Sequence, residues 1–125
     1  ASIFTGPDYV QAQRVRRLFR AELAKLWDSY DVLLTPAAPT PAARADEMDM
    51  GQSLWSRIGF TGHWNLAGVP ACAAPCGFGA SGLPMSFQVV GKAFDEATVL
   101  QVVDAYQRAT YWHLQVPPVG ALAAA

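Results

Sequence analysis

The chain has 125 residues, of which 52% are hydrophobic and 15% are charged, and its formal net charge is -1. A chain of this length forms about one domain and buries roughly two thirds of the surface that it exposes when unfolded. The weak net charge gives no general attraction to nucleic acid or to an anionic membrane, so we expect neither as a partner.

The first predicted element is an amphipathic helix over residues 8–28, which starts near Pro7 and Asp8. Its apolar side chains recur at helical spacing and are Val15, Leu18, Phe19, Leu23 and Leu26. The other side of the helix carries Arg14, Arg16, Arg17 and Arg20. We expect these arginines to be solvated or paired with nearby acids, with a phosphate-binding stripe as the alternative.

A strand and a second helix are predicted next. Residues 30–35 belong to the apolar run YDVLLTP, whose lack of alternation is typical of a strand covered on both faces. Residues 36–52 are rich in Pro and Ala and show no period, which predicts an irregular loop. The second helix is expected over 53–67, and Gly68 and Pro70 end it.

Two further strands are predicted over 70–76 and 84–90. The second strand alternates, with one face made of Met85, Phe87 and Val89 and the other of Ser86, Gln88 and Val90. Asp95 is the predicted N-cap of a last helix over 95–110, and residues 111–125 are expected to form an extended tail. This order of elements predicts an α/β fold.

The stretch GFGASG, residues 77–82, has the spacing of a dinucleotide-binding fingerprint. That fingerprint requires a helix directly after the glycines, because the helix N-terminus holds the pyrophosphate. Leu83, Pro84 and an alternating strand follow instead. We therefore predict a flexible turn between two strands, and we expect no cofactor.

Few residues suggest catalysis or metal binding. Cys72 and Cys76 match neither a zinc ligand set nor a disulfide framework, so buried free thiols are expected. His63 and His113 have no further ligand at metal-binding spacing, and no serine stands in a nucleophile elbow. Lysine bases are limited to two residues, Lys25 and Lys92.

The chain has no clear targeting or membrane segment. Residues 64–91 carry no charge, but three prolines within them argue against a membrane-spanning helix. The start, ASIFTGPDYV, has no initiator methionine and no signal-peptide pattern. We interpret the chain as part of a longer protein or as a processed product.

Three segments carry a family resemblance, and they read YDVLLTPAAPTPA, FTGHWNLAGVPACAAPCGF and GLPMSFQVVGKAFDEATVLQVVDAYQ. In this order they resemble the C-terminal portion of the amidase signature family, over residues 7–118. The resemblance implies that the whole chain, 1–125, is a C-terminal segment with part of a mixed β-sheet flanked by helices. It also implies a cytoplasmic enzyme that hydrolyses or transfers acyl groups at carbon–nitrogen amide bonds.

The catalytic groups of the family are a serine nucleophile, a second serine in a cis peptide and a lysine base. In the family these groups lie upstream of the part matched here, and this chain has no Gly-Ser-Ser stretch. No catalytic residue is therefore assigned, and the chain alone is expected to be inactive. Its expected partners are a small-molecule amide substrate in the full-length parent, and either the upstream part of the enzyme or further copies of itself.

The resemblance also implies a substrate contact, because the helix before the Asn-Leu-x-Gly-x-Pro motif, here 65–70, lines part of the acyl pocket in the family. Trp55, Ile58 and Gly62 are the candidate substrate-binding residues. Glutamine-dependent members carry an acid near position 58, so Ile58 favours an apolar or aryl acyl group. Core packing is the alternative for Trp55 and Ile58, and Asn65 is expected to cap the turn after the helix.

A second interpretation comes from a different class of function. The chain would be a non-catalytic assembly or binding module that keeps the fold without the catalytic residues. The missing serines and lysine favour this interpretation, and the start without methionine argues against it.

Overall fold

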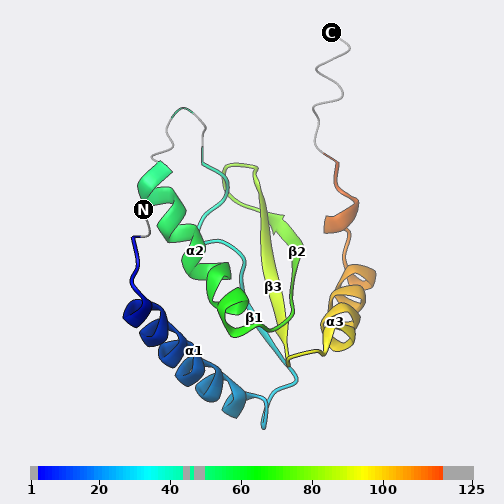
Figure 1. Cartoon of the computed structure of the whole chain (residues 1–125). Coiled ribbons are helices and arrows are strands. Elements are labelled where there is room, and N and C mark those ends of the chain that lie inside the picture. The colour runs from blue at the N-terminus through cyan, green and yellow to red at the C-terminus, as the bar shows by residue number, and fades with distance from the viewer. Residues whose placement is uncertain (1–2, 44–45, 47–49, 117–125) are drawn as a thin grey trace.

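The structure is a computed structural model that describes residues 3–43, 46 and 50–116, with the backbone alone for 50–58. Its elements are α1 (Gly6–Leu26), β1 (Val32–Pro36), α2 (Met50–Ala67), β2 (Ala71–Phe78), β3 (Pro84–Gly91), α3 (Glu96–Ala109) and the short 3-10 turn η2 (Trp112–Leu114) (Figure 1). Each predicted helix and strand coincides with one of these elements. The largest shift is at the start of α2, at residue 50 rather than 53.

The strands form one antiparallel sheet in the order β1-β3-β2. GFGASG forms the connection between β2 and β3, where Gly79 N donates to Leu83 O at 2.9 Å and Gly82 N donates to Gly79 O at 2.9 Å. The predicted turn is confirmed, because a strand and not a helix follows the glycines. The α/β fold class is also confirmed, and the described part of the sheet is antiparallel throughout.

Helices cover both faces of the sheet (Figure 1). On one face α1 and α2 pack against β3 in a cluster made of Leu23, Trp64, Ala67 and Val90. On the other face α3 packs in a cluster made of Ala74, Val89, Val99 and Val103. Val89 and Val90 are both fully buried and belong to opposite clusters, as the alternation predicts. The expected cover of β1 is incomplete, because Leu34 is 63% exposed.

Helix α1 begins two residues before its predicted start. Thr5 is the N-cap, and its backbone N donates to Asp8 Oδ2 at 2.8 Å while its hydroxyl accepts from Asp8 N at 3.4 Å. These reciprocal bonds form a capping box that satisfies amides at the helix start. Bonds from the Thr5 hydroxyl and amide lower the pKa of Asp8, so this cap holds at neutral pH and is lost when acid protonates the carboxylate.

The apolar stripe of α1 is buried on one side only. Leu23 lies in the core, whereas Val15 and Leu18 are 52% and 65% exposed. The helix is rotated so that Arg16 faces α2, where Arg16 Nε donates to Leu66 O at 2.6 Å. The prediction that all four arginines lie on the solvent side is therefore wrong for Arg16.

No helix within the described residues is both long and apolar enough to cross a bilayer.

Candidate functional site

The three candidate substrate-binding residues all fall on α2. Trp55 and Ile58 lie in the helix backbone, but their side chains are outside the described part of the chain. Gly62 is half-buried, and at about 3.6 residues per turn it lies on the side of the helix opposite Trp64 and Ala67. By the same helical spacing, positions 55 and 58 lie on the same side of the helix as Gly62.

This side of α2 is open to solvent near Gly62. Gly59 and Leu66 lie about one turn before and after Gly62, and both are exposed. A Cβ placed at Gly59 would meet no atom within 4 Å. A substrate or another protein segment can therefore reach this helix face.

The C-terminus of α2 is fixed by backbone geometry. Gly68 adopts a φ of 72°, and its N donates to Asn65 O at 3.2 Å, while Val69 N donates to Trp64 O at 3.3 Å. These bonds form a Schellman motif, which favours glycine because the left-handed conformation strains other residues. The cap uses the backbone carbonyl of Asn65, whose side chain is exposed, so Asn65 caps the turn through its main chain.

A contact from α1 completes this helix end. Leu66 O is one of the last carbonyls of α2, and it accepts the bond from Arg16 Nε. A Cβ at Gly68 would lie 3.7 Å from Arg16 Nη2, so the guanidinium lies against the cap. Gly68 thus ends α2, and Leu66 O joins that end to α1.

Two glycine substitutions, one just after α2 and one within it, should have opposite effects. Gly68→Ala should lower the free energy of unfolding by about 1–2 kcal/mol, because alanine must adopt the left-handed conformation. Gly59→Ala is the matched control, and it should raise stability by up to about 1 kcal/mol, because it adds a good helix former in open space. Urea unfolding of both variants measures this, and equal shifts would contradict the assignment of the cap.

The side chain of Gln88 anchors α2 near its middle. It is 3% exposed, and its Nε2 donates to Phe60 O at 2.6 Å and to Pro36 O at 3.0 Å. The side-chain amide of Gln88, which lies on β3, therefore links this strand to α2 and to the end of β1. The strand alternation predicts a face for Gln88 but no role, although a glutamine on an inward face between apolar neighbours is itself a signal.

The other candidate groups serve the fold. His63 packs edge-on against Trp64 at 4.0 Å between ring centroids and against Phe19 at 6.4 Å. Cys72 and Cys76 are free thiols, but they are half-buried rather than buried as expected. The described residues contain no group of three His, Cys, Asp or Glu side chains able to hold a metal ion.

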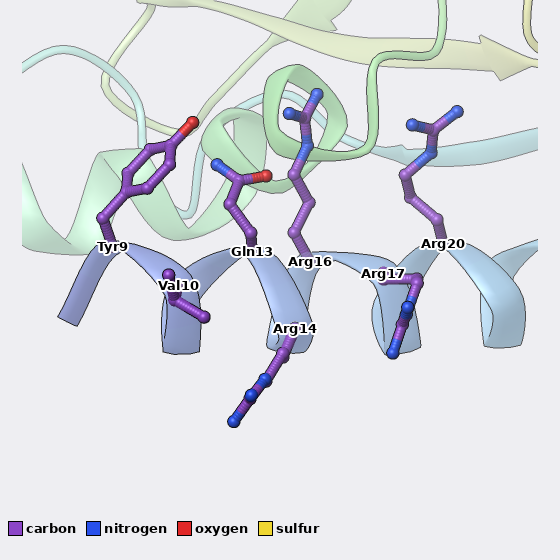
Figure 2. Close-up of a pocket in the computed structure, with 7 residues that line it drawn as sticks. All are labelled: Tyr9, Val10, Gln13, Arg14, Arg16, Arg17 and Arg20. Atoms are coloured by element: carbon purple, nitrogen blue, oxygen red, sulfur yellow. The ribbon is translucent and has the colours of Figure 1, made fainter. Parts of the chain in front are cut away.

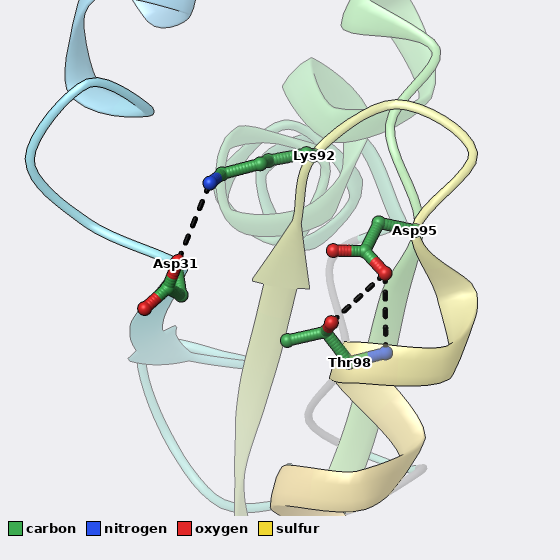
Figure 3. A network of polar contacts seen from close by, with 4 residues as sticks. All are labelled: Asp31, Lys92, Asp95 and Thr98. Atoms are coloured by element: carbon green, nitrogen blue, oxygen red, sulfur yellow. Dashed lines mark hydrogen bonds and ion pairs between the residues drawn. The ribbon is translucent and has the colours of Figure 1, made fainter.

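Both lysines that could act as bases are paired with carboxylates. Lys25 Nζ lies 2.7 Å from Glu22 Oε1, and Lys92 Nζ lies 3.3 Å from Asp31 Oδ1 (Figure 3). Neither is arranged to take a proton from a hydroxyl nucleophile. Asp95, close to Lys92 in the same figure, caps α3 as predicted, because its Oδ1 accepts from Thr98 N at 3.3 Å.

Comparison with known proteins places these features in a family. The family model described as Amidase matches residues 2–100. The A subunit of glutamyl-tRNA(Gln) amidotransferase from Lysinibacillus sphaericus is 43% identical over 110 residues, which cover 87% of this chain and 22% of that protein. The crystal structure of the Thermotoga maritima protein of the same name has a TM-score of 0.67 at 37% identity and covers 73% of this chain and 20% of its own.

A more distant structure agrees in fold. The structure of 6-aminohexanoate cyclic dimer hydrolase complexed with substrate has a TM-score of 0.76 at 23% identity, covers 92% of this chain and 27% of its own, and supports the fold alone. The chain spans about a fifth of the length of the curated relatives that it matches. Because the family model matches most of the chain, the resemblance is confirmed, and the chain belongs to the amidase signature family.

Proposed function

We propose that this chain is the C-terminal segment of an enzyme that cleaves a carbon–nitrogen amide bond and releases a carboxylate and ammonia or an amine. The match of the Amidase family over residues 2–100 carries the proposal. The chain spans only about a fifth of its relatives, which agrees with catalytic serines and a lysine located upstream. The enzyme is proposed to act in the cytoplasm.

The contribution of this chain to the active site is proposed to be one wall of the acyl pocket. Trp55, Ile58 and Gly62 share one side of α2, and the exposed neighbours Gly59 and Leu66 support access to it. The Schellman cap at Gly68 and the Gln88 amide at Phe60 hold α2 at its C-terminus and near its middle. A rigid helix supports a binding wall better than a loop does.

The acyl group is proposed to be apolar or aryl. A hydrocarbon side chain at Ile58 cannot pair with the amino group of glutamine, which needs a charged or hydrogen-bonding partner when it is buried. The second candidate function is that of one component of an amidotransferase. It is favoured by the 43% identity to the A subunit of glutamyl-tRNA(Gln) amidotransferase.

The surfaces that this chain leaves open support pairing with the upstream part of the enzyme. Val15 and Leu18 on α1 and Leu34 on β1 are all more than half exposed. β1 is also an edge of the described sheet, and unpaired strand edges and apolar patches favour association. In the isolated chain the same surfaces are proposed to drive self-association.

The test compares the isolated chain with the longer polypeptide that carries it in its source cell. The chain alone should sediment as an assembly and release no ammonia from benzamide or glutamine. The longer polypeptide should hydrolyse benzamide in preference to glutamine. Turnover by the repurified chain would contradict the proposed division of the active site.

Each other outcome has a distinct meaning. A longer polypeptide that uses glutamine alone would favour the amidotransferase component over the apolar acyl preference. A source cell that holds the sequence only as a 13.4 kDa product, inactive on both amides, would favour the non-catalytic module. A compact monomer of the isolated chain at high concentration would contradict the proposed self-association.

A further inference from the structure

Positive charge is concentrated on one short part of α1. Four of the nine basic residues of the chain lie between positions 14 and 20, namely Arg14, Arg16, Arg17 and Arg20. The ion pairs of the described residues engage Lys25, Lys92 and Arg108 instead. Within the part of the chain that the structure describes, these four arginines have no carboxylate partner.

The arginines line a groove of about 590 Å³ along α1 (Figure 2). Four side chains point from the helix to the same side in this view, and they are Tyr9, Gln13, Arg16 and Arg20. Their spacing of four, three and four residues places them in one row along the helix. Arg14 and Arg17 point away from this row in the same view, and they line the other edge of the groove.

The row offers hydrogen-bond donors without a matching acid. Arg16 and Arg20 are neighbours at i and i+4, where like charges repel and destabilise a helix. Arg16 is already oriented, because its Nε donates to Leu66 O at 2.6 Å. Binding an anion therefore reduces the repulsion between Arg16 and Arg20. Because Arg16 is already held in place, binding has to order little more than the side chain of Arg20.

The geometry and charge together indicate a particular ligand chemistry. Guanidinium groups bind phosphate through paired N–H donors, and two of them in a row suit an anion with two charged ends. The Tyr9 hydroxyl and the Gln13 amide continue the row with neutral donors. We propose that the Tyr9–Gln13–Arg16–Arg20 row binds a small soluble phosphate-bearing anion that carries at least two negative charges.

This inference is independent of the proposed amidase function. The row lies on α1, whereas the proposed acyl wall lies on α2, on the side opposite the buried Trp64 and Ala67. Loss of anion binding would leave the assignment of the acyl wall unchanged. Failure to find amide hydrolysis would likewise leave the anion site unchanged.

The test is titration calorimetry with pyrophosphate at constant ionic strength, performed on the longer polypeptide that carries this chain. Arg20→Gln should weaken binding about tenfold or more, because it removes a charge-assisted contact. Arg108→Gln is the matched control, since it removes the same charge from an exposed arginine on α3 that does not line the groove, and it should weaken binding by no more than about threefold. Glutamine is a good helix former, and far-ultraviolet circular dichroism checks that both variants fold.

A second variant keeps the test decisive if Arg20→Gln does not fold. Gln13→Leu keeps the charge and should weaken pyrophosphate binding about threefold to tenfold by removing a neutral donor. Absence of binding by the unmodified polypeptide, or equal losses for Arg20→Gln and Arg108→Gln, would overturn the proposal. So would binding to vesicles of phosphatidylcholine with phosphatidic acid without binding to pyrophosphate, because the ligand would then be a lipid headgroup.

Discussion

Replacing Gln88 with leucine should lower the free energy of unfolding by about 2–4 kcal/mol. Leucine is close to glutamine in size but cannot donate a hydrogen bond. The carbonyls of Phe60 and Pro36 would then lose the donor that reaches them at 2.6 and 3.0 Å. Both bonds are part-buried and Gln88 is 3% exposed, so each lost bond should cost about 1–2 kcal/mol and the two together produce a large loss. Urea unfolding followed by circular dichroism measures it.

The matched control for this variant is Gln101→Leu. Gln101 lies on α3 and is exposed, so the same change there should alter stability by less than about 0.5 kcal/mol. Gln88→Leu should also loosen the contact between α2 and β3, which faster amide exchange in both elements would reveal. A loss for Gln88→Leu no greater than that for Gln101→Leu would show that the two bonds do not contribute to stability.

Local patterns in the sequence predict most of the fold. The alternation in 84–90 predicts which residues of β3 face each helical layer, because side chains alternate between the faces of any strand. The Asp95 cap and the turn after Phe78 depend on neighbouring residues, and both follow from sequence. The elements therefore lie within a few residues of their predicted bounds.

Contacts between distant segments could not be predicted in this way. Gln88 reaches acceptors that are 28 and 52 residues away in sequence, and Arg16 reaches Leu66 across 50 residues. The rotation of α1 depends on where α2 ends, so the period of α1 alone predicts a stripe but not which half of it is buried. Asn65 caps the turn through its backbone carbonyl, because the left-handed conformation of Gly68 directs its amide to that oxygen.

The candidate site was predicted by resemblance and not by local chemistry. Periodicity places Trp55, Ile58 and Gly62 on one side of a helix, but that pattern is equally typical of core packing. Substrate contact by this side of the helix stays a proposal, and the described part of α2 adds one observation near Gly62. Its neighbours Gly59 and Leu66 are exposed, so this chain does not supply a core for that side.

The acyl-wall proposal predicts a large change in specificity for Ile58→Glu in the longer polypeptide. The kcat/KM for benzamide should fall about 100-fold, because a carboxylate facing an apolar acyl group is left without a partner when water is excluded. The kcat/KM for glutamine should fall less or rise, because the new acid can pair with its amino group. The ratio of the two values is therefore the quantity to measure.

Leu100→Glu is the control for this variant. It makes the same apolar-to-acid change on α3, at a leucine that is 58% exposed and lies outside the proposed wall. Its ratio of benzamide to glutamine activity should stay within about twofold of the unmodified enzyme, even if its stability falls somewhat. A general loss of folded enzyme lowers both activities together and leaves the ratio unchanged. An unchanged ratio for Ile58→Glu would therefore remove Ile58 from the acyl pocket and favour core packing at that position.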